Sequence, residues 1–125
     1  MVSQVLRKSE KTEERPAQRP IDMVHLSRQS LGDPGLEEEI LRMFDQLAAA
    51  YVGRLRGAVK DDDTLLSLHS LKGASAGVGA RAIASLTSEA EAEFRLEGKL
   101  SGERLADISM AVEEVRTYIS ELLGD

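Results

Sequence analysis

The residues best able to do chemistry lie in one short run of the sequence around His69. This histidine is one of two in the chain, and Lys72 and Gly73 follow it three and four residues later. In a helix, residues three and four apart are neighbours on one face. The spacing therefore predicts a helix that presents an imidazole and an ammonium side by side, with bare backbone beside them at Gly73.

The chemistry that suits this arrangement is the transfer of a phosphoryl group. A neutral imidazole is a nucleophile near physiological pH, and its phosphorylation places a dianion on the helix surface. Lys72 supplies a cation within reach of that dianion. Glycine inside a helix costs about 1 kcal/mol relative to alanine, so Gly73 suggests that a second protein must come close to His69. We therefore predict His69 as phospho-acceptor and Lys72 as the residue that stabilises the phosphoryl charge.

A helical wheel indicates that His69 does not face the core. The face that carries His69 also holds Leu65, Lys72 and Ala76. A second face, centred roughly 140° away on the wheel, holds Thr64, Leu68, Leu71, Ser75 and Val78. We expect the imidazole to point sideways or outward, and we expect a partner to dock on Gly73, Leu65, Leu66 and Ala76. Leu65 and Leu66 lie outside the buried stripe, so they either form an apolar docking patch or are covered by a leading helix.

The run from His69 to Ala80 reads His-Ser-Leu-Lys-Gly-Ala-Ser-Ala-Gly-Val-Gly-Ala. It resembles the signature of histidine phosphotransfer (HPt) domains, the relay modules of multistep two-component signalling. The resemblance covers the phospho-acceptor, the lysine, its neighbouring glycine and the Gly-Ala pair that closes the helix. It extends more loosely to a four-helix pattern over residues 22–123.

This resemblance implies a phosphorelay intermediate rather than an autokinase. His69 would accept a phosphoryl group from the aspartyl phosphate of one receiver domain and pass it to another receiver domain. The expected partners are the receiver domains of response regulators and of a hybrid histidine kinase. The resemblance implies no cofactor on this chain, and Mg²⁺ is expected on the partner receiver domain.

Two other interpretations remain open from the sequence. A histidine-kinase dimerisation domain also presents a histidine on a helical bundle, but there an acidic residue, an arginine and a proline typically follow it. Here Ser70, Leu71 and Lys72 follow, and we find no glycine-rich nucleotide-binding half. A helical adaptor with an inert His69 would bind receiver domains without relay chemistry, although such a module would have no reason to keep Lys72 and Gly73.

Composition disfavours several other classes of protein. The chain has no cysteine and only two histidines, so we expect no disulfide and no metal site. Its formal net charge is −6 and its aromatic content 3%, which disfavours binding to nucleic acid. No apolar run approaches the ~18 residues that cross a bilayer, and the first residues lack a secretory signal. We expect a cytoplasmic monomer that does not bind membranes.

The chain is expected to divide into a tail and one domain. Residues 1–20 mix both signs of charge with few apolar residues, which predicts a disordered N-terminal tail. Residues 21–125 would form the HPt-like four-helix bundle domain. Ile21 to Leu31 predicts a short leading helix capped by Asp22, and His25 within it is interpreted as a surface or packing residue.

Four longer amphipathic helices are expected to follow. Asp33 and Pro34 begin the first, whose apolar residues recur at helical spacing: Leu36, Ile40, Met43, Phe44, Leu47, Tyr51, Leu55 and Val59. The run from Asp61 to Asp63 is interpreted as the cap of the histidine helix rather than as a metal site. Gly79 and Gly98 end the second and third helices, and Ser101 caps the fourth. Short connections favour an all-α, antiparallel up-down-up-down four-helix bundle with a short extra N-terminal helix.

Overall fold

The structure is a computed structural model that describes residues 19–125. In this part of the chain every regular element is a helix. The elements are α2 (Met23–Gln29), α3 (Pro34–Gly57), α4 (Asp61–Val78), α5 (Arg81–Glu97) and α6 (Gly102–Leu123). The all-α class and the short leading helix are confirmed. The predicted tail, residues 1–20, lies almost wholly outside the described residues.

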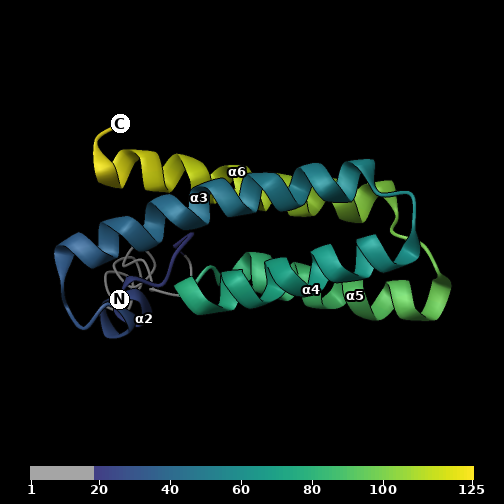
Figure 1. The fold of residues 1–125 in the computed structure, drawn as a ribbon, viewed down its shortest axis with the longest axis horizontal. Helices are drawn as coiled ribbons and strands as arrows, with labels where there is room; N and C mark the ends of the chain where they lie inside the picture. Colours follow the sequence, from purple (N-terminus) through teal and green to yellow (C-terminus); the bar gives the residue numbers. More distant parts are fainter. Residues whose placement is uncertain (1–18) are drawn as a thin grey trace, which may run out of the picture.

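The four long helices run in alternating directions and form an antiparallel bundle (Figure 1). Helices α3 and α6 make up one layer, and α4 and α5 make up the other (Figure 1). Each helix packs on the next in sequence, and α6 closes the ring against α3. Connections as short as residues 58–60 and 79–80 leave no room for a crossover, which confirms the predicted up-down-up-down order.

Local signals fix most of the helix ends. The Asp33 side chain accepts hydrogen bonds from the backbone N–H groups at the start of α3, and Ser101 does the same for α6. Gly79 and Gly98 follow α4 and α5 with φ values of 88° and 74°. Only glycine enters this left-handed region without strain, so both glycines end their helices as predicted.

The start of α4 differs from its prediction. Lys60, rather than an aspartate, occupies the cap position, and it makes no side-chain cap bond. Asp61, Asp62 and Asp63 instead form the first turn of the helix. Their carboxylates stabilise the positive end of the helix dipole there. The interpretation of this run as a cap is therefore wrong, although its position at the helix start is right.

The core consists of aliphatic side chains from all five helices together with Phe44 and Phe94. On α4 the predicted inward face is confirmed, because its members are all buried: Thr64, Leu68, Leu71, Ser75 and Val78. On α3 the predicted stripe is only partly right. Met43 is 58% exposed, while Leu41 and Ala48 are buried in the core. The buried face of α3 is the one that contacts both α4 and α6. It is adjacent to, but not the same as, the face on which apolar residues recur most regularly in the sequence.

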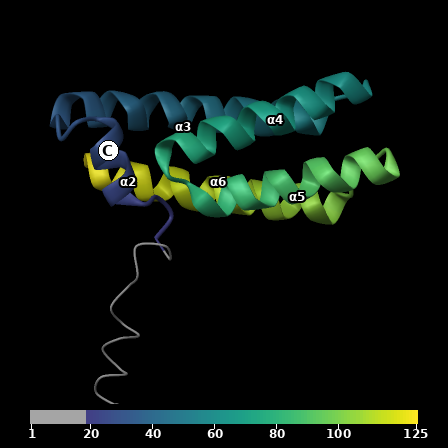
Figure 2. The same ribbon diagram turned by 90° about the horizontal axis from the view of Figure 1, so that it is seen from below.

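Helix α2 lies at the end of the bundle where α3 begins and α6 ends (Figures 1 and 2). Asp22 caps it as predicted, by accepting hydrogen bonds from two backbone N–H groups of its first turn. The Asp22 backbone N–H donates to the Gly79 carbonyl at 2.9 Å, and its carboxylate pairs with Arg81 at 2.7 Å. These bonds attach α2 to the turn between α4 and α5.

His25 adds a third attachment between α2 and the end of α4. Its Nε2 lies 3.0 Å from the Gly77 carbonyl oxygen. Since a carbonyl only accepts hydrogen bonds, this geometry requires the proton on Nε2. The interpretation of His25 as a packing residue is consistent with this contact.

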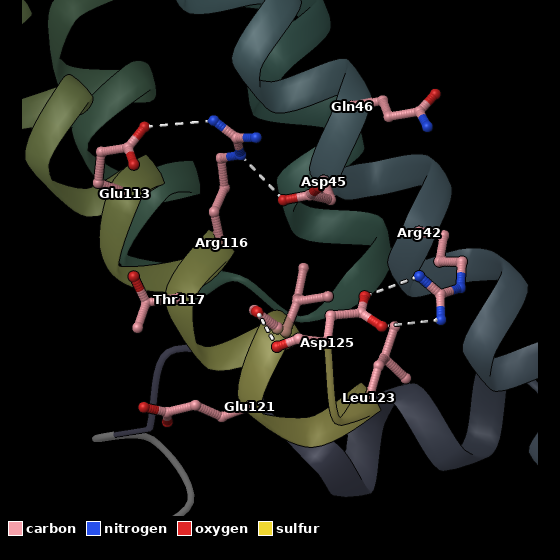
Figure 3. Close-up of a pocket in the computed structure, with 11 residues that line it drawn as sticks. Arg42, Asp45, Gln46, Glu113, Arg116, Thr117, Glu121, Leu123 and Asp125 are labelled. Atoms are coloured by element: carbon pink, nitrogen blue, oxygen red, sulfur yellow. Dashed lines mark hydrogen bonds and ion pairs between the residues drawn. The ribbon is translucent and has the colours of Figure 1, made fainter.

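A groove of about 430 Å³ lies between α3 and α6, on the layer that does not carry His69 (Figure 3). Charged side chains line it, and its arginines are paired with carboxylates. Arg42 contacts Asp125 at 2.8 Å, and Arg116 contacts Asp45 at 2.9 Å. Exposed ion pairs of this kind contribute about 0–1 kcal/mol each, so they connect α6 to α3 without dominating stability. Among the described residues no helix is long and apolar enough to span a membrane.

Candidate functional site

His69 lies near the middle of α4, on the side of the helix opposite to the core. Its side chain is 67% exposed. The neighbouring Leu68 and Leu71 are fully buried and hold α4 in the bundle with this face turned outward. The predicted outward direction of the imidazole is confirmed.

A glutamate from the neighbouring helix lies beneath the histidine. The Glu91 side chain on α5 is only 8% exposed. Lys72 Nζ lies 2.9 Å from its Oε1, and an Arg95 guanidinium nitrogen lies 2.8 Å from its Oε2. His69 Nδ1 lies 3.5 Å from the same Oε2. One buried carboxylate therefore contacts the two residues that the sequence singles out for chemistry.

The Glu91 carboxylate is held in its charged form. Its pKa is lowered first by Lys72 and then by Arg95, and these effects exceed the opposite effect of burial. Lys72 contacts Oε1 at ion-pair distance but outside hydrogen-bond alignment, so Oε1 is buried without an aligned donor among the described residues. A buried charge is tolerated when it is paired. The cluster thus combines an ionised carboxylate, two cations and an exposed imidazole.

The lowered pKa of Glu91 predicts a stability that depends on pH. Its interactions contribute fully above the ordinary glutamate pKa of about 4.3, and they are lost as the pH falls through the lower pKa of the folded protein. We expect Glu91→Gln to be less stable than wild type at about pH 6, and we expect this difference to be smaller at about pH 3, because protonation of Glu91 removes the charge that glutamine also lacks. Urea unfolding followed by circular dichroism at both pH values measures this difference. A difference that does not change with pH would contradict the assignment.

The predicted docking residues differ in their accessibility. Leu66 is 65% exposed, and Gly73 and Ala76 are also exposed. Leu65 is partly buried against the core of the bundle. Helix α2 contacts the opposite, C-terminal end of α4, so the idea that it covers Leu65 and Leu66 is wrong. Leu66, rather than Leu65, supplies the apolar surface near His69.

Gly73 has no packing role within the described part of the chain. A Cβ atom built at this position would meet no heavy atom within 4 Å. The folded bundle could therefore accommodate a larger residue there, and the helix would gain stability from alanine. The glycine leaves the backbone of α4 open one turn from His69.

Glu91 and Arg95 were not predicted as site residues from the sequence. Glu91 lies four residues after Thr87 and three before Phe94, which are both buried. The signal available in the sequence for Glu91 was its position as a charged residue at the edge of a buried helical stripe. Two nearby glutamates, Glu89 and Glu93, differ from it because they pair with Arg104 at the surface. In residues 19–125 no three His, Asp or Glu side chains gather as metal ligands would.

Comparison with known protein families gives a match over most of the chain. Residues 38–123, more than half of the chain, match the family described as Hpt domain. The matched region contains His69, Lys72, Glu91 and Arg95, together with most of α3 and all of α4 and α5. Comparisons with curated proteins and with solved structures gave no match.

Proposed function

Because the chain belongs to the Hpt domain family, and thus serves phosphotransfer in phosphorelays, we propose that His69 carries the phosphoryl group. It accepts the group from the aspartyl phosphate of one receiver domain and passes it to a second. The observation that supports this most is the position of His69. It is an exposed imidazole at mid-helix, with Lys72 and Glu91 grouped at its base and open backbone at Gly73.

The transfer itself needs little from this chain beyond the nucleophile. A lone pair on an imidazole nitrogen attacks phosphorus and forms an N–P bond. The P–O bond to the aspartate breaks, and its electron pair leaves with the carboxylate. Phosphoryl transfer is accelerated mainly by positioning and by cations around the transferred oxygens, which the receiver supplies through its Mg²⁺ and lysine. The binding of Mg²⁺ by the receiver and a cytoplasmic location are parts of the same proposal.

The receiver is proposed to dock over the outer face of α4. Leu66 offers exposed apolar area there, and Gly73 and Ala76 lack side chains that would hold a partner away from His69. These residues bracket the histidine along one helix. The surface is therefore suited to a protein whose own active site closes over the imidazole.

Transfer profiling tests this function. Each phosphorylated receiver of the source organism is mixed with the chain, and radiolabel is followed. We expect label to move to this protein from at least one receiver, in a form that is labile to acid and stable to alkali, as a phosphoramidate bond is. If no receiver labels the chain, the proposal is wrong.

Lys72 is proposed to stabilise the phosphoryl group on His69, so its loss should slow the relay. We expect Lys72→Ala to reduce the transfer rate or the lifetime of phospho-His69 by up to about fivefold, because one partly exposed cation contributes at most about 1 kcal/mol. The transfer rate is measured by stopping the reaction at set times and separating the labelled proteins on gels. Titration calorimetry with the receiver should show unchanged docking. Lys60→Ala removes the same charge from the exposed start of α4 and serves as the control. Equal behaviour of the two variants would contradict this role.

A kinase-dimerisation module fits less well. Such a module needs two chains to complete four helices, whereas one copy of this chain forms all four. We therefore expect a monomer in gel filtration, with no labelling from ATP alone. A helical adaptor would bind receivers and remain unlabelled in the transfer profile.

A further inference from the structure

We propose that Arg54, whose guanidinium stacks on the Tyr51 ring, selects which receiver domains dock beside His69. It favours a receiver that presents a carboxylate next to an apolar side chain. The inference rests on the proposed function and deepens it, because it names a residue of α3 that sets the choice of partner and the chemical group that this residue recognises.

A groove between α3 and α4 reaches the side of His69. It has a volume of about 500 Å³, and Tyr51 and Arg54 line it from α3. From α4 it is lined by Leu66 and Ser70, which lie three residues before and one residue after His69. A receiver that closes over the imidazole therefore also covers this groove.

The face of α3 that carries Tyr51 is apolar and exposed. Met43 and Leu47 precede Tyr51 by eight and four residues, so all three lie on one side of the helix. Met43 and Leu47 are exposed, and so is Leu66 on α4. Such apolar area beside a reacting residue is typical of a surface that binds another protein. A docked partner would explain why the most regular apolar stripe of α3 is not its buried face.

Arg54 is charged but is not paired with a carboxylate. Its guanidinium carbon lies 5.2 Å from the centre of the Tyr51 ring, and it takes part in no ion pair within residues 19–125. Five other arginines of the bundle do pair with carboxylates: Arg42, Arg81, Arg95, Arg104 and Arg116. A guanidinium stays charged and binds carboxylates through a planar fork of donors. The fork of Arg54 is therefore available to a carboxylate of the partner.

The stacked ring holds this guanidinium in place before a partner arrives. The separation is within the range of a cation–π contact, and Tyr51 is itself packed against the core. A side chain that is already ordered in the free protein loses less conformational freedom when it binds. Tyrosine and arginine are also residue types that often anchor interfaces. The pair therefore fits one specific contact better than a general attraction between charges.

Asp63 restricts where the carboxylate of the partner can lie. It lines the same groove from the first turn of α4, and Asp61 and Asp62 belong to that turn as well. A second carboxylate opposite these residues would be repelled. The preferred receiver therefore places its acid against Arg54 and its apolar side chain against Leu66, and it places no acid against the start of α4.

The first test separates docking from chemistry, with a receiver that labels this chain. We expect Arg54→Ala to raise the Kd and the KM for that receiver about tenfold, as the loss of an anchoring arginine does. The transfer rate at saturating receiver should not change, and neither should the uptake of phosphate from phosphoramidate, a donor too small to need docking. Arg54→Lys keeps the charge but loses the planar fork, so its Kd should lie between the two. If Arg54→Ala slows the saturated rate and the uptake from phosphoramidate, the residue acts in the chemistry and the inference is wrong.

The second test identifies the carboxylate of the partner by charge reversal. Arg54→Glu should weaken binding of the receiver more than Arg54→Ala does, because it adds repulsion to the lost attraction. Each acidic residue on the docking surface of the receiver is then replaced by lysine in turn. We expect one of these receiver variants to restore binding to Arg54→Glu and to bind wild type more weakly. If none does so, the recognised group is not a carboxylate and the inference is overturned.

Arg56→Ala is the matched control, because it removes the same charge two residues later on α3. The Arg56 guanidinium bonds to Ser109 on α6, away from the groove. This control should bind the receiver as wild type does, and circular dichroism should show that all of these variants are folded. If receivers label the chain but bind Arg54→Ala as tightly as Arg56→Ala, the inference fails while the proposed function stands. If no receiver labels the chain, the proposed function fails and the inference fails with it.

Discussion

Replacing His69 with glutamine should abolish the uptake of phosphate from every receiver domain and leave the fold unchanged. An amide has no nucleophilic nitrogen, so the loss should be complete rather than partial. The histidine side chain is largely exposed, and exposed substitutions usually change the free energy of unfolding by less than about 0.5 kcal/mol. Radiolabel transfer measures the first effect, and circular dichroism with urea unfolding measures the second.

His25→Gln is the control for this experiment, because it changes the only other histidine of the chain. That side chain contacts the end of α4 rather than the exposed face around His69. The His25 variant should accept phosphate at the wild-type rate. Labelling of the His69 variant, or loss of labelling in the His25 variant alone, would show that the phospho-acceptor has been assigned to the wrong residue.

Replacing Gly79 with alanine should destabilise the domain by about 2–3 kcal/mol. Its φ of 88° lies in the left-handed region, where an L-residue costs roughly 1–2 kcal/mol. A Cβ atom there would also lie 3.0 Å from the Asp22 carbonyl oxygen and 3.3 Å from the His25 ring. The substitution therefore adds a collision with the start of α2 to the strain of the turn.

Gly98→Ala separates the two contributions. Gly98 ends α5 with a similar φ of 74°, but its Cβ would meet no heavy atom of residues 19–125 within 4 Å. The Gly98 variant should be destabilised only by the strain of a left-handed alanine, about 1 kcal/mol. Urea unfolding gives both values, and hydrogen exchange of the Asp22 amide, which donates to Gly79, should be accelerated in the Gly79 variant alone. Equal destabilisation in the two variants would mean that α2 is not held at this turn.

The bundle was predictable from sequence because its signals are local. Gly79 and Gly98 end helices through their own backbone freedom, and Ser101 caps α6 with a bond to a residue three positions later. These interactions depend on nearby residues only. The inward face of α3 was not predictable in the same way. Met43 and Leu41 are both apolar, and only the positions of α4 and α6 around α3 decide that Leu41 is buried while Met43 is exposed.

The candidate site also combines features that the sequence determines with features that only the packing of helices determines. The sequence by itself determined the spacing of His69, Lys72 and Gly73, because one turn of a helix fixes their order and their common face. It could not assign Glu91, which belongs to another helix and has the same side chain as its surface neighbours. Only the packing of α5 on α4 buries that carboxylate beneath the imidazole and the lysine. Only the tertiary structure determines the burial and pairing of Glu91, because both depend on which helices pack together.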